Sequence, residues 1–238
     1  MSELSWDTLY TDHANAYEIL VSHEDYQGNL LRAIQAVQPL AGKSSVEFGC
    51  GTGRLSGLLA GSVKKLHAFD FTAPMLRLAR KSQRLQGWRN VSLALADSRR
   101  MPVRSGWADF AIEGWAFLQI AVWHPDDWQE QLGRALNEMH RIVRPGGKLI
   151  LIETLGTGES TPRVIPFFRS VYDFLEEQAG FVPRRIRTDY RFETLEQVRQ
   201  VVLPLFGQEM LTRLVQTEAG WVLPECTGLW FRDRAFVK

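Results

Sequence analysis

Short apolar segments alternate with longer segments that carry a helical repeat along the central part of the chain. Continuous apolar runs of this kind are typical of strands that are buried on both faces of a parallel sheet. They lie at residues 45–48, 66–69, 91–96, 108–112 and 149–152. The pattern therefore predicts five buried strands, most of them separated by helices.

The clearest helix is predicted over residues 126–143. Apolar side chains recur there at steps of three and four residues and form one stripe: Trp128, Leu132, Ala135, Leu136, Met139, Ile142 and Val143. The following Arg144-Pro145-Gly146-Gly147 predicts a turn before the next strand. A second helix is predicted over residues 74–85, with a proline in its first turn.

Strands that alternate with helices favour a parallel sheet, because parallel neighbours need a crossover between them. With right-handed crossovers, the chain is expected to form an α/β, doubly wound, Rossmann-like sheet with helices on both faces. We expect a single domain over residues 1–238, with a core at 44–155 and a C-terminal half at 156–238. Outside the core we expect an N-terminal helical cap at 1–43 and a helical insertion near 193–219.

Composition narrows the class of protein. The 238 residues are 45% apolar and 23% charged, which is typical of a globular protein and not of a disordered one. Lys and Arg number 28 against 27 Asp and Glu, and a formal charge of +1 disfavours nucleic acid as a partner. No apolar run reaches the roughly 20 residues of a membrane span. The sequence gives no indication of the oligomeric state.

The expected location is the cytoplasm. The N-terminal stretch is acidic and lacks the basic and apolar regions of a secretory signal. The two cysteines, Cys50 and Cys226, lie far apart, and Cys50 stands between glycines, a poor setting for a structural disulfide. Both observations favour a reducing compartment.

A glycine-rich segment follows the first predicted strand, with Gly49, Gly51 and Gly53 shortly after Glu47. Glycine lets the backbone adopt positive φ and approach a ligand closely. A dinucleotide fingerprint that starts at Gly49 would need glycine at position 54, where Arg54 stands, and no P-loop lysine follows. A tight turn without a ligand is the alternative interpretation of these glycines.

The segment Glu47-x-Gly49-x-Gly51-x-Gly53 resembles motif I of the class I S-adenosylmethionine-dependent methyltransferases, in particular the small-molecule, ubiquinone/menaquinone-type branch. The other motifs of this family have counterparts in the same order along the chain. Asp70 ends the second predicted strand, and Asp97 ends the third. Residues 143–149 closely resemble the proline-glycine-glycine turn that precedes the fifth strand of the family. The resemblance covers about residues 40–155. It also implies two last strands near 182–192 and 226–232, and with them a mostly parallel sheet of seven strands.

The resemblance implies S-adenosylmethionine as the cofactor and no metal. Asp70 is implied to bind the ribose, since one carboxylate can accept from two vicinal hydroxyls, and Asp97 to lie near the adenine amino group. Glu47 is expected to hold the amino-acid part indirectly or through water. Taken singly, each aspartate is equally explained as a helix cap or loop residue. The expected cofactor-binding residues are Glu47, Gly49, Cys50, Gly51, Thr52, Gly53, Asp70, Phe71, Met75, Asp97, Ser98, Glu113, Gly114 and Trp115.

The acceptor is expected beside the residues that follow the fourth strand, since ligands bind beyond the carboxyl ends of such strands. His124 is the candidate catalytic base, because imidazole titrates near neutral pH; the alternative is a loop histidine without a chemical role. Tyr17 in the N-terminal cap and Glu153 at the end of the fifth strand are candidate substrate-binding residues. Glu113 and Glu153 either face the cleft or mark the ends of their strands.

We therefore expect transfer of a methyl group from S-adenosylmethionine to a nucleophilic O, N, S or C atom of a small-molecule acceptor. The alternative is a non-catalytic binding or scaffold protein that retains the cofactor fold. The glycine loop and the two strand-end acids argue for the enzyme, whereas the lack of an assured base leaves the alternative open.

Overall fold

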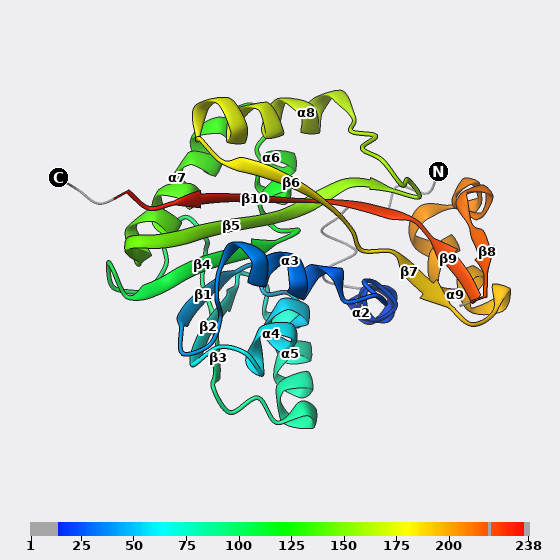
Figure 1. Cartoon of the computed structure of the whole chain (residues 1–238), viewed down its shortest axis with the longest axis horizontal. Helices are drawn as coiled ribbons and strands as arrows, with labels where there is room; N and C mark the ends of the chain where they lie inside the picture. The colour runs from blue at the N-terminus through cyan, green and yellow to red at the C-terminus, as the bar shows by residue number, and fades with distance from the viewer. Residues whose placement is uncertain (1–13, 219, 236–238) are drawn as a thin grey trace.

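The protein is built around a seven-stranded sheet (Figure 1). The computed structural model describes residues 14–218 and 220–235, with only the backbone for residues 14–17. The strand order is β3-β2-β1-β4-β5-β10-β6, and β10 alone runs in the direction opposite to that of the other six strands. The strands are β1 (Ser44–Phe48), β2 (Lys65–Asp70), β3 (Val91–Leu95), β4 (Ala108–Gly114), β5 (Val143–Thr157), β6 (Val182–Arg187) and β10 (Glu225–Asp233). The expected doubly wound, mostly parallel α/β sheet is confirmed.

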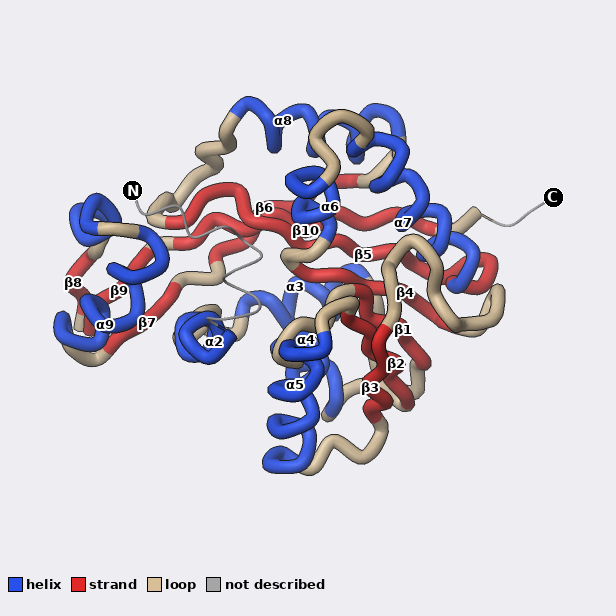
Figure 2. Tube along the Cα trace, turned by 180° about the vertical axis from the view of Figure 1, so that it is seen from behind, coloured by secondary structure: helices blue, strands red, loops and turns tan. Residues whose placement is uncertain are grey.

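Helices cover both faces of this sheet, as Figures 1 and 2 show. One face packs against α3 (Asn29–Val37), α4 (Arg54–Ala60) and α5 (Ala73–Gln86), and the other against α6 (Phe117–Trp123), α7 (Trp128–Ile142) and α8 (Pro166–Asp173). A π-helical turn, η1 (Phe174–Gln178), continues α8. The side chains of β5 alternate between the two cores: Leu149 and Leu151 pack with the α7 layer, and Ile150 and Ile152 with the α3 layer. This alternation explains why residues 149–152 of the strand are all apolar.

The two helices predicted from periodicity are present with small changes at their ends. Residues 126–143 contain α7, and residues 74–85 lie within α5. The turn expected at 144–147 is different: these residues already belong to β5, with Gly146 at φ 77°. The amide of Gly146 donates to the carbonyl of Arg234, and the amide of Arg234 donates to Gly147. The end of β10 thus provides backbone partners that a local sequence pattern does not reveal.

The N-terminal region is only partly a cap. Helix α2 (Ala14–Ser22) lies beside the C-terminal part of the chain, but α3 buries Leu30, Ala33 and Ile34 in the same core as α4. The prediction that all of residues 1–43 lie outside the core is therefore wrong for α3. The hydrophobic stripe of α3 fills one of the two layers over the sheet.

A second, three-stranded antiparallel sheet with the order β7-β9-β8 lies at the far end of the molecule. It consists of β7 (Tyr190–Phe192), β8 (Val215–Thr217) and β9 (Gly220–Leu223), and packs with α9 (Leu195–Phe206) and the short helix η2 (Gln208–Arg213). The insertion near 193–219 is therefore not wholly helical, and the strand expected near 182–192 is divided between two sheets. Strands of three residues carry too little periodicity to be recognised.

No helix in the described part of the chain is long and apolar enough to cross a membrane. Cys50 and Cys226 are both free and buried.

Candidate functional site

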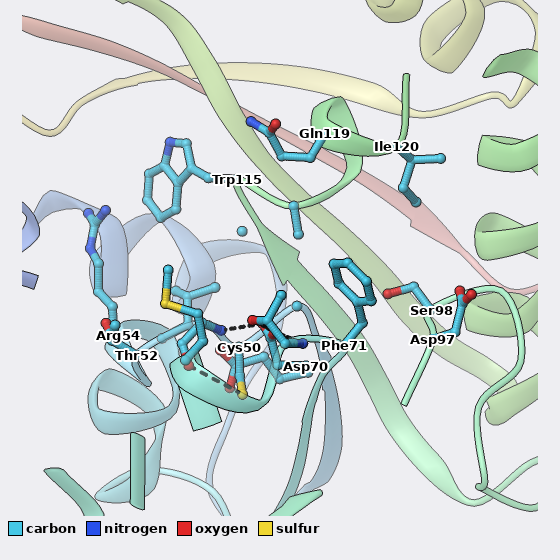
Figure 3. A pocket seen from close by; sticks show the side chains of 18 of the residues that line it. Cys50, Thr52, Arg54, Asp70, Phe71, Asp97, Ser98, Trp115, Gln119 and Ile120 are labelled. Carbon is cyan, nitrogen blue, oxygen red and sulfur yellow. Dashed lines mark hydrogen bonds between the residues drawn. The ribbon is translucent and has the colours of Figure 1, made fainter. Parts of the chain in front are cut away.

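A cavity of about 450 Å³ opens at the carboxyl ends of β1, β2, β3 and β4 (Figure 3). This is the edge of the sheet at which open α/β folds bind ligands, and the volume falls in the range of small-molecule sites. Most of the expected cofactor residues line it: Glu47, Gly49, Cys50, Gly51, Thr52, Asp70, Phe71, Met75, Asp97, Ser98, Gly114 and Trp115. The structure thus brings together in one cavity residues from four strand ends.

The glycine loop requires glycine where it meets the loop after β4. Gly49 has φ 67°, and a Cβ atom there would overlap the Cβ of Ala116. Gly51 has φ 53° and open space where a Cβ would lie. Gly53 does not line the cavity and instead packs against Trp88. On the cavity side, the backbone of the loop can therefore approach a ligand closely. Gly53 instead serves the packing of α4.

Asp70 is held in a fixed orientation at the end of β2. Its Oδ2 accepts from the amide of Gly51 at 2.8 Å, and its Oδ1 accepts from the amide and hydroxyl of Thr72 at 2.8 and 2.6 Å. The residue is 8% exposed and lines the cavity. A carboxylate oxygen has two acceptor sites, so the one partner of Oδ2 leaves this oxygen able to accept from a ligand hydroxyl.

The opposite wall of the cavity is made by Asp97 and Arg99, and the sequence pattern did not single out Arg99. Arg99 binds both carboxylate oxygens of Asp97, with Nε at 2.9 Å from Oδ1 and Nη2 at 2.7 Å from Oδ2. This guanidinium lowers the pKa of Asp97 below its ordinary value. Arg99 Nη1 also donates to Oε1 of Gln131 at 2.8 Å. Asp97 therefore stays ionised, and Arg99 ties it to α7.

His124 lies at this same end of the cavity. Its Nε2 is 3.0 Å from Nη1 of Arg99, so the imidazole accepts from the guanidinium. Its Nδ1 lies 3.7 Å from Asp127 Oδ1. Helix α6 ends just before His124, which lines the cavity near Asp97. Its expected role as a catalytic base stays a prediction. The lone pair that a general base would use is engaged with Arg99.

Glu47 forms part of the cavity floor and is nearly fully buried. The hydroxyl of Ser56 donates to its Oε2 at 2.6 Å. Burial raises the pKa of Glu47 to about 8, with the nearby charge of Asp70 adding to the effect. At pH 7 this carboxyl is therefore mainly protonated, and it offers a ligand a neutral hydrogen-bonding group rather than a charge.

Glu113 and Glu153 do not line the cavity, contrary to the roles expected for them. Glu113 accepts from the amides of Ala116 and Phe117, and Glu153 accepts from the amide of Leu118 at 2.8 Å. Both carboxyls are buried, which raises their pKa values, that of Glu153 to about 8. Their place is beneath the turn from β4 to α6, where they bind the first amides of the helix.

The remaining substrate candidate, Tyr17, is in α2, and its side chain lies outside the described residues. Its expected role therefore stays a prediction. Among the described residues, no group of three or more His, Cys, Asp or Glu side chains is placed to hold a metal ion.

The end of the cavity away from Asp97 is formed by Arg54, Trp115 and Gln119 (Figure 3). The Arg54 guanidinium lies 4.0 Å from the centre of the Trp115 ring, and its Nη1 donates to Oε2 of Glu24 at 2.7 Å. Trp115 has φ 56°, a strained value for a residue other than glycine. The buried Oε1 of Gln119 and the buried hydroxyl of Thr52 have no hydrogen-bond partner within the described structure. Buried polar atoms are normally satisfied, so two orphaned ones on a cavity wall indicate a polar ligand.

Arg54, Arg99 and Gln119 are among the lining residues that the sequence pattern did not single out. Arg54 directly follows the last glycine of the loop, and Arg99 follows Asp97 by two positions. Gln119 interrupts an otherwise apolar run at 115–123. A polar residue inside such a run is the signal that could have identified it.

Residues 46–151 match a family model described as a methyltransferase domain. These residues are a class I methyltransferase domain. The domain starts in β1 and ends in β5, so that its bounds enclose the glycine loop, both strand-end aspartates and the turn after β4. S-adenosylmethionine is the cofactor of this family.

Curated relatives of the methyltransferase domain include two kinds of enzyme. A malonyl-[acyl-carrier protein] O-methyltransferase of Pseudescherichia vulneris is 32% identical over 115 residues, which are 48% of this chain and 40% of the relative. A demethylmenaquinone methyltransferase of Oceanobacillus iheyensis is 25% identical over 191 residues, which are 78% of this chain and 73% of the relative. The chain thus spans well under half the length of the first of these relatives.

The fold of the methyltransferase domain and its surroundings is similar to that of solved structures. A SAM-dependent methyltransferase from Aquifex aeolicus superimposes with a TM-score of 0.56 at 15% identity, over 92% of this chain and 96% of that one. At this identity the likeness shows the fold alone.

The residues of the cavity fit S-adenosylmethionine. Asp70, with an oxygen able to accept from hydroxyls, suits the ribose, and the ionised Asp97 suits an exocyclic amine. The exposed ring of Phe71 lies between these two acids along the wall (Figure 3) and offers a face to a purine. The hydroxyl of Thr52, which has no partner among the described residues, lies in the glycine loop, where the amino-acid part of the cofactor has polar atoms to offer.

Proposed function

We propose that the protein transfers the methyl group of S-adenosylmethionine to a nucleophilic atom of a small-molecule acceptor. The observation that carries the proposal is the single cavity in which the glycine loop, Asp70 and Asp97 meet. When bound, the cofactor supplies an electrophilic methyl group on a sulfonium. The chain itself binds and orients, with Asp70 and Asp97 holding the nucleoside and the glycine loop approaching the amino-acid part.

The nucleoside half of the cofactor is proposed to lie between Asp70 and Asp97, which both line the cavity. The sulfonium then points to the end of the cavity formed by Arg54, Trp115 and Gln119. In-line displacement needs the acceptor at near van der Waals distance and in line with the breaking bond, so this end has the task of alignment and exclusion of water.

A small-molecule acceptor is supported by the size of the cavity and by the name of one relative, which acts on demethylmenaquinone. The buried free thiols of Cys50 and Cys226 support the cytoplasm as the location. We also propose that residues 1–238 form one domain of this class, in which α2 and the three-stranded sheet are additions to the core.

Calorimetry with S-adenosylhomocysteine tests the first half of this proposal. We expect binding to the wild type and a loss of at least about tenfold in affinity for Asp70→Asn, because charge-assisted hydrogen bonds to the ribose are weakened. Asp233→Asn, which removes a charge that pairs with Lys148 and is 71% exposed, is the matched control and should bind like the wild type. Binding of NAD in place of the nucleoside would contradict the proposal.

Incubation with isotopically labelled cofactor and a small-molecule extract, followed by mass spectrometry, tests the second half. Labelled methyl groups should appear in one or a few small molecules. Binding of the cofactor without any such product would instead favour the non-catalytic, scaffold alternative.

A further inference from the structure

The helices α3, α4 and α5, which cover one face of the seven-stranded sheet, contain no Asp or Glu. Between residues 26 and 96 the acidic residues are Glu47 and Asp70 alone, against ten Lys and Arg. Both acids are buried and line the cavity. The whole chain has a formal charge of +1, so the residues outside this segment are net acidic. The nearly balanced total charge therefore does not reveal a basic layer on one side of the molecule.

The cations of this layer are concentrated on the outer side of α5. The inner side of the helix buries Met75, Leu76 and Ala79. Exposed cations recur on the other side at steps of three and four residues, which places them in one stripe along the helix. This basic stripe consists of Arg77, Arg80, Lys81 and Arg84.

The loops at the far end of α5 extend the basic stripe. Lys64 and Lys65 lie where α4 leads into β2, and Arg89 lies where α5 leads into β3; all three are exposed. Asn90 joins the two loops, because its side-chain amide donates to the carbonyl of Val63 at 2.8 Å. None of the seven cations in the stripe and the loops forms an ion pair with a described acid.

Exposed apolar side chains lie at both ends of the basic stripe. Leu85 is 77% exposed and directly follows Arg84 near the end of α5. At the start of the helix, Phe71 is 56% exposed and lines the cavity, and Leu95 at the neighbouring end of β3 is 58% exposed. In Figures 1 and 2, α5 lies at the lower edge of the molecule with no other described helix or strand beyond it. The basic stripe therefore faces solvent along the whole helix.

Cations beside protruding apolar side chains suit the surface of an anionic membrane. Lys and Arg are attracted by the negative potential there, and Leu and Phe can enter the boundary between headgroups and acyl chains. A protein partner suits this face less, because protein interfaces have few charges at their centre, whereas Arg80 and Lys81 occupy the middle of α5. A nucleic acid would bind the cations through its phosphates and leave Leu85 in water.

We propose that the outer side of α5, together with Lys64, Lys65 and Arg89, binds anionic lipid at a membrane surface. Because Phe71 and Met75 line the cavity, a protein bound through this face holds the rim of the cavity close to the lipid. The contact is peripheral and involves no covalent step. It does not depend on the methyl transfer proposed above, since none of these cations lines the cavity.

Co-sedimentation with vesicles tests the proposal on the whole chain. One set of vesicles is phosphatidylcholine with about 30% phosphatidylglycerol, and the other is phosphatidylcholine alone. We expect the wild type to bind the anionic vesicles at least about 100-fold more tightly, and to lose most of this binding as the salt concentration rises. Equal affinities for the two kinds of vesicle, or no binding to the anionic ones, would overturn the proposal.

A triple variant of α5 locates the contact. Arg80→Gln/Lys81→Gln/Arg84→Gln removes most of the basic stripe. It should weaken binding to the anionic vesicles at least about 30-fold, since each cation near such a surface contributes about fivefold. Binding within about threefold of the wild type would contradict the location of the contact on α5.

The matched control changes the net charge by the same amount elsewhere. Arg169→Gln/Arg185→Gln/Arg199→Gln removes exposed arginines of α8, β6 and α9. Its affinity for the anionic vesicles should stay within about threefold of that of the wild type. A loss as large as that of the α5 variant would mean that the total charge, and not the face of α5, governs binding, and it would overturn the proposal.

Leu85→Ser distinguishes a lipid surface from other anions. It should weaken binding to the anionic vesicles several-fold, because the leucine no longer enters the boundary of the acyl chains. Unchanged binding of this variant would contradict the contact of Leu85 with lipid. A DNA duplex that binds the wild type but not the triple α5 variant, while anionic vesicles bind neither, would assign the face to nucleic acid and overturn the lipid proposal.

The melting temperature and the affinity for S-adenosylhomocysteine separate this proposal from a loss of folding and from the proposed function. All the substituted side chains are exposed and lie outside the cavity lining, so both quantities should match those of the wild type in every variant. A wild type that binds vesicles but not the nucleoside would refute the proposed methyl transfer and leave lipid binding in place. A wild type that binds the nucleoside but not the vesicles would refute lipid binding alone.

Discussion

The buried pair Glu113 and Glu153 should make the stability of the protein fall as the pH rises. Burial raises the pKa of Glu153 to about 8, against an ordinary value of 4.5, and raises that of Glu113 through burial and the neighbouring Glu153. Between these values the folded protein holds a proton that the unfolded chain releases. The contribution of Glu153 to the free energy of unfolding is therefore fully present below about pH 4.5, decreases as the pH rises, and is lost above about pH 8.

The perturbation is Glu153→Gln, a neutral side chain of the same shape whose oxygen can still accept from the amide of Leu118. A proton that is bound in the folded state but not in the unfolded state changes the free energy of unfolding by at most about 1.4 kcal/mol per pH unit. Between pH 6 and pH 8 the wild type should therefore lose about 2 kcal/mol more than the variant. Removing the charge of Glu153 also favours ionisation of Glu113, which reduces the slope of the variant further.

Urea unfolding at pH 6, 7, 8 and 9 measures these slopes, and the comparison depends on the slope and not on the absolute stability, which the substitution also changes. The control is Glu130→Gln on α7, where the side chain is 63% exposed and pairs with Arg134. Its profile should run parallel to that of the wild type. A Glu153→Gln profile parallel to the wild type would refute the reasoning, because it would mean that Glu153 is ionised in the folded protein throughout this range.

Further predictions concern the cavity. Gly49→Ala should reduce the affinity for S-adenosylhomocysteine at least about tenfold and lower the melting temperature, because the new Cβ overlaps Ala116; an unchanged Kd by calorimetry would count against the close approach. Thr52→Val should leave the ligand-free melting temperature unchanged or higher, since the hydroxyl is buried without a described partner, yet weaken nucleoside binding several-fold; a destabilised free protein would show that the hydroxyl has a partner. His124→Gln should leave turnover and its pH profile nearly unchanged, because the amide still accepts from Arg99; a loss of about 100-fold or more would restore a role as base.

The position of the site could be predicted from the sequence because its parts are local. Each of Gly49, Asp70 and Asp97 directly follows a predicted strand, and parallel strands bring their carboxyl ends to one edge. The order of elements and the bounds of α5 and α7 are likewise set by short-range periodicity, which a sequence displays directly.

The arrangement of the end of the cavity formed by Arg54, Trp115 and Gln119 was not accessible in this way. Arg54 and Trp115 are 61 positions apart, and Glu24 lies 30 positions before Arg54. Their contact depends on how α4, the turn after β4 and the segment between α2 and α3 pack together. For the same reason the sequence did not show that the direction of α6 places His124 beside Arg99.

By itself, then, the sequence determined the five central strands, the glycine loop and the two strand-end acids, since each depends on neighbours a few residues away. The tertiary structure alone decided which carboxyls face the cavity and which lie beneath it. Glu47 and Glu113 both follow apolar strand residues, yet Glu47 reaches the cavity floor and Glu113 binds the amides of α6. Burial and hydrogen bonding depend on what packs against a residue, and those partners come from distant parts of the chain.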